Sequence, residues 1–337
     1  MISFKSKKLQ ALAAGVMLTL ALGIVGCGGG EKKAEAPKAA AKVNVGIVQL
    51  VEHAALDAAN KGFVDGMKGK GYEEGKNVTY DRQNAQADQS NLQNIAQRFV
   101  NNKVNLIYAI ATPAAQTVAN ATSDIPIVGS AITDYKTAKL VKDNNKPGTN
   151  VTGTTDMNPV AAQLDLLLKI VPNAKTVGTI YCSSEVNSQL QIAILKEAAA
   201  KKNVKVVEAT VSTVNDIQQA ARSLVGKVDA LYIPTDNILA SAMPTLSIVT
   251  QEAKLAVICG EENMCKAGGV ATLGVNYYNL GKQAGEMAAD ILAGKSKPAD
   301  MAIQGQKEFK ALVNQKEADK IGLKIPAEVL KNAEVVK

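Results

Sequence analysis

The chain has 337 residues, of which 47% are hydrophobic and 4% aromatic, and its formal net charge is +7. The length and the apolar content allow two hydrophobic cores, which must be built from aliphatic side chains because tryptophan is absent. Basic and acidic residues are interspersed without a long basic stripe, and this argues against nucleic acid as a partner.

The first residues have the pattern of a secretory signal. Three lysines precede an uncharged apolar run at 9–25, and Gly26 stands directly before Cys27. The tetrapeptide IVGC resembles the lipobox of bacterial lipoproteins, in which the cysteine is lipidated and becomes the first residue of the mature chain. A transmembrane anchor is the alternative, but the run is shorter than the roughly 20 residues that a spanning helix needs.

We therefore expect a signal peptide at 1–26 and a protein that is anchored through a palmitate-type lipid on Cys27, on the extracytoplasmic side of the cell membrane. Removal of the signal takes the net charge from +7 to +4, because the signal carries three lysines and no acidic residue. The next segment, GGGEKKAEAPKAAAK, is small, charged and without apolar periodicity. Residues 27–42 are therefore expected to form a flexible tether.

Beyond Cys27 the chain contains Cys182, Cys259 and Cys265. An odd number of cysteines is a poor basis for a disulfide framework. Cys259 and Cys265 are close enough in sequence to pair across a short loop, but unpaired buried thiols are the favoured interpretation.

From residue 43 onward, β-branched runs alternate with segments whose apolar residues are spaced at three and four. Strands are predicted at 43–48, 105–110, 125–129, 175–181, 204–211 and 228–234. Helices are predicted at 54–72, 91–102, 188–202, 214–226 and 278–294. Apolar strands that alternate with helices indicate parallel sheets with right-handed crossovers.

The two halves of this pattern match each other. Residues 75–113 and 202–236 run in the same order of elements and have similar lengths. The predicted fold class is therefore α/β, with two similar doubly wound parallel-sheet lobes joined by a multi-crossing hinge. Lobe 1 is expected at 43–153 plus about 276–304, and lobe 2 at 156–272 plus about 305–337. Hinges are expected near 152–156 and 274–277, so that the cleft between the lobes opens and closes.

Polar residues follow the carboxyl ends of the predicted strands, where parallel sheets bind ligands. When the halves are aligned, Thr112 falls opposite Asp236. Thr112, with Ala131 and Thr133, is a candidate for binding a carboxylate, and Asp236 with Asp156 is a candidate for binding an ammonium. The alternative is that such residues only cap helices. The candidate ligand-binding residues are Gln49, Glu52, His53, Thr112, Ala131, Thr133, Asp156, Tyr181, Ser184, Glu185 and Asp236.

His53 is the only histidine in the chain. A metal site would need further ligands near it, and catalysis would need an oriented partner or a known motif, and neither is visible. His53 is therefore interpreted as a wall of the ligand site together with Gln49 and Glu52, or else as a structural residue at a helix start. No catalytic residue, metal site or cofactor is expected.

Four segments of the chain resemble one known family at matching order and spacing: VGIVQLVEHAALDAANKGFVDGM, TTDMNPV, YCSSEVNS and YIPTDN. The chain resembles the bacterial ABC transporter substrate-binding lipoproteins of the tryptophan/tyrosine type, which have a type I periplasmic-binding-protein fold. It differs in reading YCSSE where that family more often has a Tyr-Asn-Pro-Ser-Glu run.

The resemblance implies that the chain binds an amino acid, with an aromatic preference, and delivers it to an ABC permease and its ATPase. It also implies a monomer. Six residues are candidates for lining the side-chain pocket: Leu50, His53, Tyr135, Tyr181, Tyr277 and Tyr278. A sugar or nucleoside receptor of the same fold is the alternative, although such sites usually use tryptophan and arginine, which are absent and scarce here. An enzyme on this fold is a weaker rival, because no catalytic motif is present.

Overall fold

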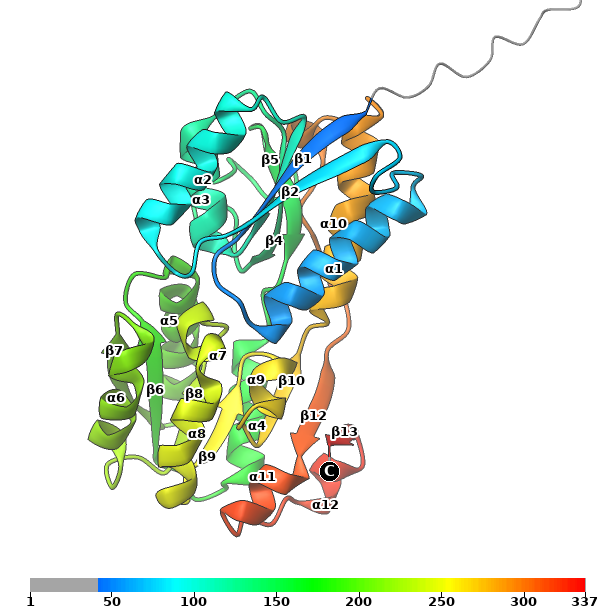
Figure 1. Cartoon of the computed structure of the whole chain (residues 1–337). Coiled ribbons are helices and arrows are strands. Elements are labelled where there is room, and N and C mark those ends of the chain that lie inside the picture. Colours follow the sequence, from blue (N-terminus) through cyan, green and yellow to red (C-terminus); the bar gives the residue numbers. More distant parts are fainter. Residues whose placement is uncertain (1–41, 337) are drawn as a thin grey trace, which may run out of the picture. The chain divides into compact units, whose positions relative to one another are not determined.

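The computed structural model describes residues 42–336, which contain two β-sheets flanked by helices (Figure 1). The predicted signal peptide, Cys27 and nearly all of the predicted tether lie outside the described residues. Within the described part, no helix is both long and apolar enough to span a membrane.

The first sheet has the strand order β11-β5-β4-β3-β1-β2, and all its pairs are parallel. Its strands are β1 (Val43–Gln49), β2 (Val78–Asn84), β3 (Leu106–Ile110), β4 (Ile127–Ile132), β5 (Val151–Thr155) and β11 (Gln304–Gly305). Every residue of β3 and β4 is buried, as expected for parallel strands that are covered on both faces.

The second sheet has the order β13-β12-β10-β9-β8-β6-β7, and it is parallel except for the β10–β12 pair. Its strands are β6 (Thr176–Cys182), β7 (Lys205–Val211), β8 (Ala230–Ile233), β9 (Ala256–Cys259), β10 (Ala271–Gly274), β12 (Lys310–Asn314) and β13 (Ala333–Val336). The order β5-β4-β3-β1-β2 in the first sheet is repeated as β10-β9-β8-β6-β7 in the second. The predicted fold class of two similar doubly wound halves is confirmed.

The first half contributes α1 (Ala54–Gly69), α2 (Gln89–Asn101) and α3 (Thr112–Ala121). The second half contributes α4 (Val160–Ile170), α5 (Val186–Ala200), η1 (Val214–Asp216), α6 (Ile217–Leu224), α7 (Asn237–Ser241), α8 (Met243–Glu252) and α9 (Glu262–Lys266). The remaining helices are α10 (Tyr277–Leu292), η2 (Pro298–Asp300), α11 (Gln315–Lys320) and α12 (Ala327–Leu330). Buried residues of α1 recur at three and four positions, which is the pattern from which that helix was predicted.

The chain passes between the two sheets three times. It crosses after β5 through residues 156–159, after β10 through 275–276, and after β11 through 306–309. The first two crossings overlap the segments that the sequence suggested as hinges. Hinge motion at these places stays a prediction.

Helix α10 returns to the first sheet and packs along α1, as Figure 1 shows. The two helices approach through glycines, because a Cβ atom at Gly281 would lie 2.0 Å from the carbonyl oxygen of Ala59 and one at Gly285 would lie 2.2 Å from that of Phe63. Gly62 and Gly66 have equally little room on the facing side of α1. Only glycine allows the two backbones to come this close.

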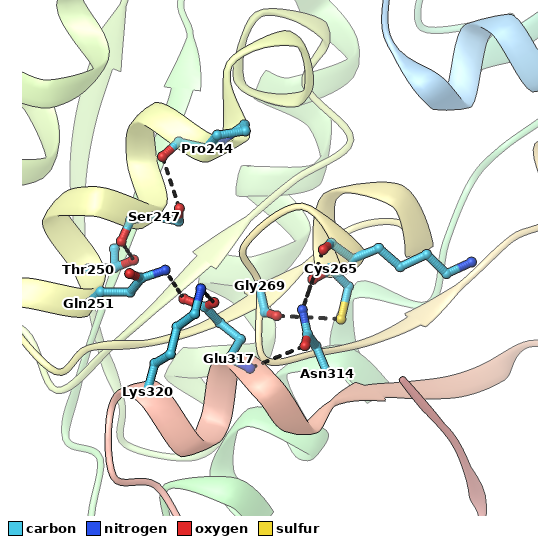
Figure 2. A network of polar contacts seen from close by, with 10 residues as sticks. Pro244, Ser247, Thr250, Gln251, Cys265, Gly269, Asn314, Glu317 and Lys320 are labelled. Carbon is cyan, nitrogen blue, oxygen red and sulfur yellow. Dashed lines mark hydrogen bonds and ion pairs between the residues drawn. The ribbon is translucent and has the colours of Figure 1, made fainter. Parts of the chain in front are cut away.

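The C-terminal segment is held to the second half by a polar network (Figure 2). The Asn314 side chain donates a 2.9 Å hydrogen bond to the carbonyl oxygen of Cys265, and Gln251 donates one of 2.8 Å to Glu317. Asn314 also caps α11 by accepting from the Glu317 backbone N–H. These bonds attach β12 and α11 to α8 and α9.

The three cysteines of the described part, Cys182, Cys259 and Cys265, are buried free thiols. This agrees with the favoured interpretation of the sequence. Burial raises the pKa of each thiol, so all three stay protonated at neutral pH.

Candidate functional site

A small cavity of about 10 Å³ lies between the two halves of the chain. This is far below the range of about 300–1,000 Å³ that is typical of small-molecule sites and leaves room for about one water molecule in this arrangement of the halves. The first half contributes α1 and β4, the second half contributes α7 and α9, and the wall is completed by α10 and the crossing segment after β5. The lining residues are His53, Leu56, Ala131, Asp156, Thr235, Asp236, Asn237, Ala240, Glu261, Met264 and Tyr277.

Carboxyl groups are the main titratable groups of this cavity. Asp156, Asp236 and Glu261 line it, and Glu185 lies directly behind Asn237. All four side chains are at most 3% exposed. In residues 42–336 every ion pair is made by other acids, so no lysine or arginine compensates these four. Buried carboxylates without a cation are unfavourable, so these groups either hold protons or bind a cationic group.

Asp236 lines the cavity, but both of its carboxylate oxygens already accept hydrogen bonds from other groups of the protein. Its Oδ1 accepts a 2.9 Å bond from the Leu239 N–H and caps α7, while its Oδ2 accepts from the Cys182 N–H at 2.6 Å and from Ser188 at 2.7 Å. Burial raises its pKa. These bonds give Asp236 the helix-capping role that the sequence left open as an alternative.

Glu261 and Glu185 are also held by donors from the protein. Glu261 caps α9 by accepting from two backbone N–H groups, and burial raises its pKa to about 7. Glu185 accepts from the side chains of Asn237 at 2.7 Å and Asn187 at 2.9 Å. Burial, and next the charge of Asp236, raise the pKa of Glu185 to about 8.

Asp156 differs from the other three acids. Its Oδ2 accepts a 2.6 Å hydrogen bond from the Tyr277 hydroxyl, but its Oδ1 is buried and has no partner. It is the only one of the four with such an oxygen. Burial raises its pKa, with the Tyr277 bond opposing the shift. The Thr133 hydroxyl also opposes the pKa shift of Asp156. A buried carboxylate oxygen without a partner of good geometry can accept a hydrogen bond from a ligand.

His53 stands at the N-cap position of α1 without capping it, and its ring lines the cavity. Its Nε2 lies 3.4 Å from Oδ1 of Asn237, on the opposite half of the chain. Burial lowers the pKa of His53 to about 4, so the ring is neutral at physiological pH. No three His, Cys, Asp or Glu side chains of the described part are arranged to hold a metal ion. His53 is thus a neutral wall residue that bridges the two halves.

A second, more open groove lies on the other side of the contact between His53, Asn237 and Glu185. Its wall from the first half comes from α2 and α3, and its wall from the second half includes Ser184. The lining residues are Leu50, Ala87, Gln89, Leu92, Pro113, Gln116, Thr117, Asn120, Cys182, Ser184, Glu185, Ser212 and Ile238. Because Glu185 bonds to Asn237 of the cavity wall, these residues separate the groove from the cavity.

The structure brings further predicted residues to this region. Ala131 lines the cavity, where it has a φ of +56° next to a register shift between β4 and β5. Thr133 is buried and accepts a 3.3 Å bond from Gln191, which comes from the other half. Thr112 begins α3, is buried, and its hydroxyl has no hydrogen-bond partner. Thr133 therefore lies at the junction of the two halves, whereas Thr112 lines neither the cavity nor the groove.

Other predicted residues take no part in the cavity or the groove. Gln49 fastens the turn after β1 by bonding to Asp57 and the Val51 carbonyl. Glu52 is exposed and lines neither space. Side chains alternate along a strand, so Tyr181 lies on the face of β6 opposite to that of Cys182, which lines the groove. The Tyr181 hydroxyl donates a hydrogen bond to Glu208.

Of the other tyrosines suggested for a side-chain pocket, only Tyr277 lines the cavity. Tyr135 is buried in the core and bonds to the Thr154 carbonyl, and Tyr278 bonds to Asp65 on the outer side of α1. Leu50 lines the groove.

Sequence reasoning missed a regular feature of the cavity. Three helices each present a polar residue at the N-cap and an apolar residue one turn later: His53 and Leu56, Asp236 and Ala240, Glu261 and Met264. The spacing of three or four residues places each pair on one helix face. In the sequence this feature is visible as a polar residue at a helix start that is followed, three or four positions later, by an apolar residue.

The comparisons with known proteins decide the family. Residues 44–337 match the family described as ABC transporter substrate binding protein. The chain belongs to this family. Its role as the substrate-binding protein of an ABC transporter, predicted from the sequence, is confirmed.

Several individual relatives of this substrate-binding protein are known. It is 43% identical over 319 residues to a "Tyrosine-binding protein" of Clostridioides difficile, with 92% of this chain and 91% of the relative covered. A domain from Streptococcus pneumonia, solved in complex with L-Trp, has 38% identity and a TM-score of 0.85, and covers 88% of this chain and 100% of its own.

A third relative was solved in a ligand-free, open form. This substrate binding protein with adhesive properties from Clostridium difficile has 45% identity and covers 88% of this chain and 99% of its own, but its TM-score is only 0.67. The L-Trp complex superposes better although its sequence is less similar. The ligand-free, open structure is thus the less similar of the two in shape, although it is the more similar in sequence.

Proposed function

We propose that this substrate-binding protein takes an α-amino acid with an aromatic side chain into the cavity between its halves and delivers it to an ABC permease and its ATPase. The observation that carries the proposal is the group of buried carboxyls without a cation, in which Asp156 keeps one oxygen free. The tyrosine-binding name of one relative and the L-Trp complex of another support the aromatic class.

In this proposal the ammonium of the ligand binds Oδ1 of Asp156. The carboxylate extends toward the start of α3, where the Thr112 hydroxyl is buried without a partner and the helix N-terminus favours a negative charge. The side chain contacts the apolar residues Leu56, Ala240 and Met264 of the cavity. No residue of the site is assigned a catalytic role.

Isothermal titration calorimetry on residues 43–337 tests the proposal. Tyrosine, tryptophan and phenylalanine should bind, and glucose and nucleosides should not. A ligand that binds only the folded form also raises the free energy of unfolding, by about 2.7 kcal/mol at a ligand concentration of 100 times Kd, and the melting temperature rises with it. A sugar or nucleoside that binds while the amino acids do not would contradict the proposal and favour the other receptor class.

We further propose that the protein is a lipoprotein on the extracytoplasmic side of the membrane and acts there as a monomer. The support is the signal-like N-terminus and the IVGC sequence that ends at Cys27. Cys27→Ser should abolish lipid labelling and membrane retention and leave ligand binding unchanged. Mass spectrometry that finds Cys27 unmodified in membrane-extracted protein would contradict this.

A further inference from the structure

We infer that Gln191 of α5 is a positioning residue that holds the two halves together, and that its bond to Thr133 sets how fast the halves separate and release a ligand. Gln191 is not among the residues that the sequence suggested for the site. The inference concerns the movement of the halves, so it goes beyond the proposed function and does not depend on the identity of the ligand.

Gln191 is completely buried, and both ends of its side-chain amide are bonded. Its NH₂ group donates to the hydroxyl of Thr133 at 3.3 Å and to the hydroxyl of Thr235. Its Oε1 accepts a 3.1 Å bond from the Thr235 N–H and a 3.4 Å bond from the side chain of Asn158. A buried amide whose donors and acceptor are all used is held in one orientation.

The three partners of Gln191 belong to parts of the chain that must move relative to one another when the halves separate. Thr133 follows β4 in the first half, Asn158 lies in the first crossing, and Thr235 follows β8 in the second half. Gln191 itself comes from α5 and stays with the second half. Separation of the halves therefore breaks its bond to Thr133 and spares its bonds to Thr235.

Few side chains link the halves directly. In the part of the chain that the structure describes, two side-chain hydrogen bonds join the first half to the second outside the crossings. One is the contact of His53 with Asn237, which is partly buried, and the other is the fully buried bond of Gln191 with Thr133. At the start of the same helix as Gln191, Val186 packs against the core of the first half. Because burial strengthens a hydrogen bond, the Gln191 contact should hold the halves together more firmly than the His53 contact.

The test is a double-mutant cycle. Thr133→Val removes the acceptor hydroxyl and keeps the shape of the side chain, and Gln191→Met keeps the length of the side chain and removes the donor. A cycle is needed because the Thr133 hydroxyl also opposes the pKa shift of Asp156, and because Gln191 also bonds to Thr235. Thr179→Val is the matched control, since it removes a buried threonine hydroxyl that has no hydrogen-bond partner.

Release is followed by stopped-flow fluorescence with L-tryptophan as the probe and excess L-tyrosine as the displacing ligand. The chain contains no tryptophan, so tryptophan fluorescence comes from the probe alone. Thr133→Val should release the probe about fivefold faster, as expected for the loss of one hydrogen bond, with little change in association. Adding Thr133→Val to Gln191→Met should bring little further acceleration, because both changes remove the same bond. Thr179→Val should release the probe at the rate of the unaltered protein.

Two kinetic results would overturn the inference. The first is a release rate that Thr133→Val leaves unchanged, even if its melting temperature falls, because the bond would then have a structural role only. The second is a cycle in which Thr133→Val and Gln191→Met accelerate release independently, because the two residues would then not act through their common bond.

Small-angle X-ray scattering on the ligand-free protein gives a reading that needs no ligand. Thr133→Val and Gln191→Met should have a larger radius of gyration than the unaltered protein and Thr179→Val. If no aromatic amino acid binds, the proposed function is wrong and the scattering alone decides this inference. Equal radii of gyration in the unaltered protein and the variants would then overturn it.

Discussion

Nε2 of His53 lies 3.4 Å from Oδ1 of Asn237, although 184 residues separate them in the sequence. His53 precedes α1 of the first half, and Asn237 begins α7 of the second, so the contact joins the two halves at the cavity wall. The ring is neutral and donates through Nε2 when the proton resides there. A movement of the two halves away from each other would break this contact.

His53→Ala should therefore speed ligand release. Loss of one neutral hydrogen bond of about 1 kcal/mol corresponds to a roughly fivefold faster dissociation, with a smaller change in association. Stopped-flow fluorescence with a displacing ligand measures both rates. The neighbouring variant Glu52→Ala is the control, because that side chain is exposed. Equal dissociation rates in His53→Ala and the unaltered protein would contradict a bridging role.

The buried carboxyls predict how stability depends on pH. The pKa of Glu185 is raised to about 8 and that of Glu261 to about 7, so the folded protein holds protons that the unfolded chain releases. The free energy of unfolding of the ligand-free protein must then fall as pH rises through these values. His53 has the opposite effect on stability, because its pKa is lowered to about 4 in the folded protein, and the free energy of unfolding then rises with pH below the ordinary value of 6.5. Between pH 6.5 and 8, Glu185 and Glu261 therefore determine how the free energy of unfolding changes with pH.

Urea unfolding at pH 6.5 and pH 8 measures this effect. We expect lower stability at pH 8 without ligand, and a smaller loss in Glu185→Gln, which cannot ionise. Ligand affinity should change in the opposite sense and rise with pH, because ionised carboxylates attract an ammonium. A ligand-free stability that increases from pH 6.5 to 8 would contradict the raised pKa values.

Asp156 and Asp236 should respond differently to substitution. Asp156→Asn removes the charge opposite the proposed ammonium, and losses of a buried charge partner are about 2–5 kcal/mol in binding. Asp236→Asn disturbs a helix cap and two further bonds, so its main effect should be on stability, by about 1 kcal/mol or more. Calorimetry and thermal melts on both variants separate the two roles. Asp236→Asn with normal stability and lost affinity would reverse the assignment.

The sequence predicted the fold well because parallel strands that are buried on both faces leave continuous apolar runs, and because the second half repeats the first. It missed β9 and β10, which have only four residues each, and with them the start of α9 that carries Glu261 and Met264. The alternation of side chains along β6 places Tyr181 on the face opposite to that of Cys182. Cys182 lines the groove, and Tyr181 bonds to Glu208 instead.

The roles of the acids could not be read from the sequence for a different reason. Asp236 and Asp156 both follow a strand, and only the bonds made in the folded protein show that one is satisfied and the other keeps a free oxygen. Whether a buried carboxylate oxygen finds a hydrogen-bond donor depends on distant segments of the chain. Ser188 supplies such a donor for Asp236, and Tyr277 supplies one for Asp156.

The contact between α1 and α10 leads to a prediction about stability. Gly281→Ala places a methyl group 2.0 Å from the backbone oxygen of Ala59, so the two helices must separate. Overpacking of this kind costs about 1–3 kcal/mol. Thermal melting should show a clear drop. Gly69→Ala at the end of α1 is the control, because a methyl group there meets nothing within 4 Å, and it should leave the melting temperature unchanged or raise it.

The apolar end of the cavity predicts a change in ligand choice. Ala240 is the smallest of the three apolar residues that follow the helix caps, and Leu56 and Met264 reach the cavity from α1 and α9. Ala240→Leu adds three carbons to the wall of this narrow cavity, so tryptophan should lose more affinity than the smaller phenylalanine, by about tenfold or more if the protein cannot adjust. Calorimetry with both amino acids gives the ratio. Ala193→Leu, on the exposed face of α5, adds the same atoms away from the cavity and should leave the ratio unchanged. If Ala240→Leu binds tryptophan and phenylalanine with the original ratio, the side chain of the ligand does not enter this end of the cavity, and the groove beyond His53 and Asn237 becomes the place to look for it.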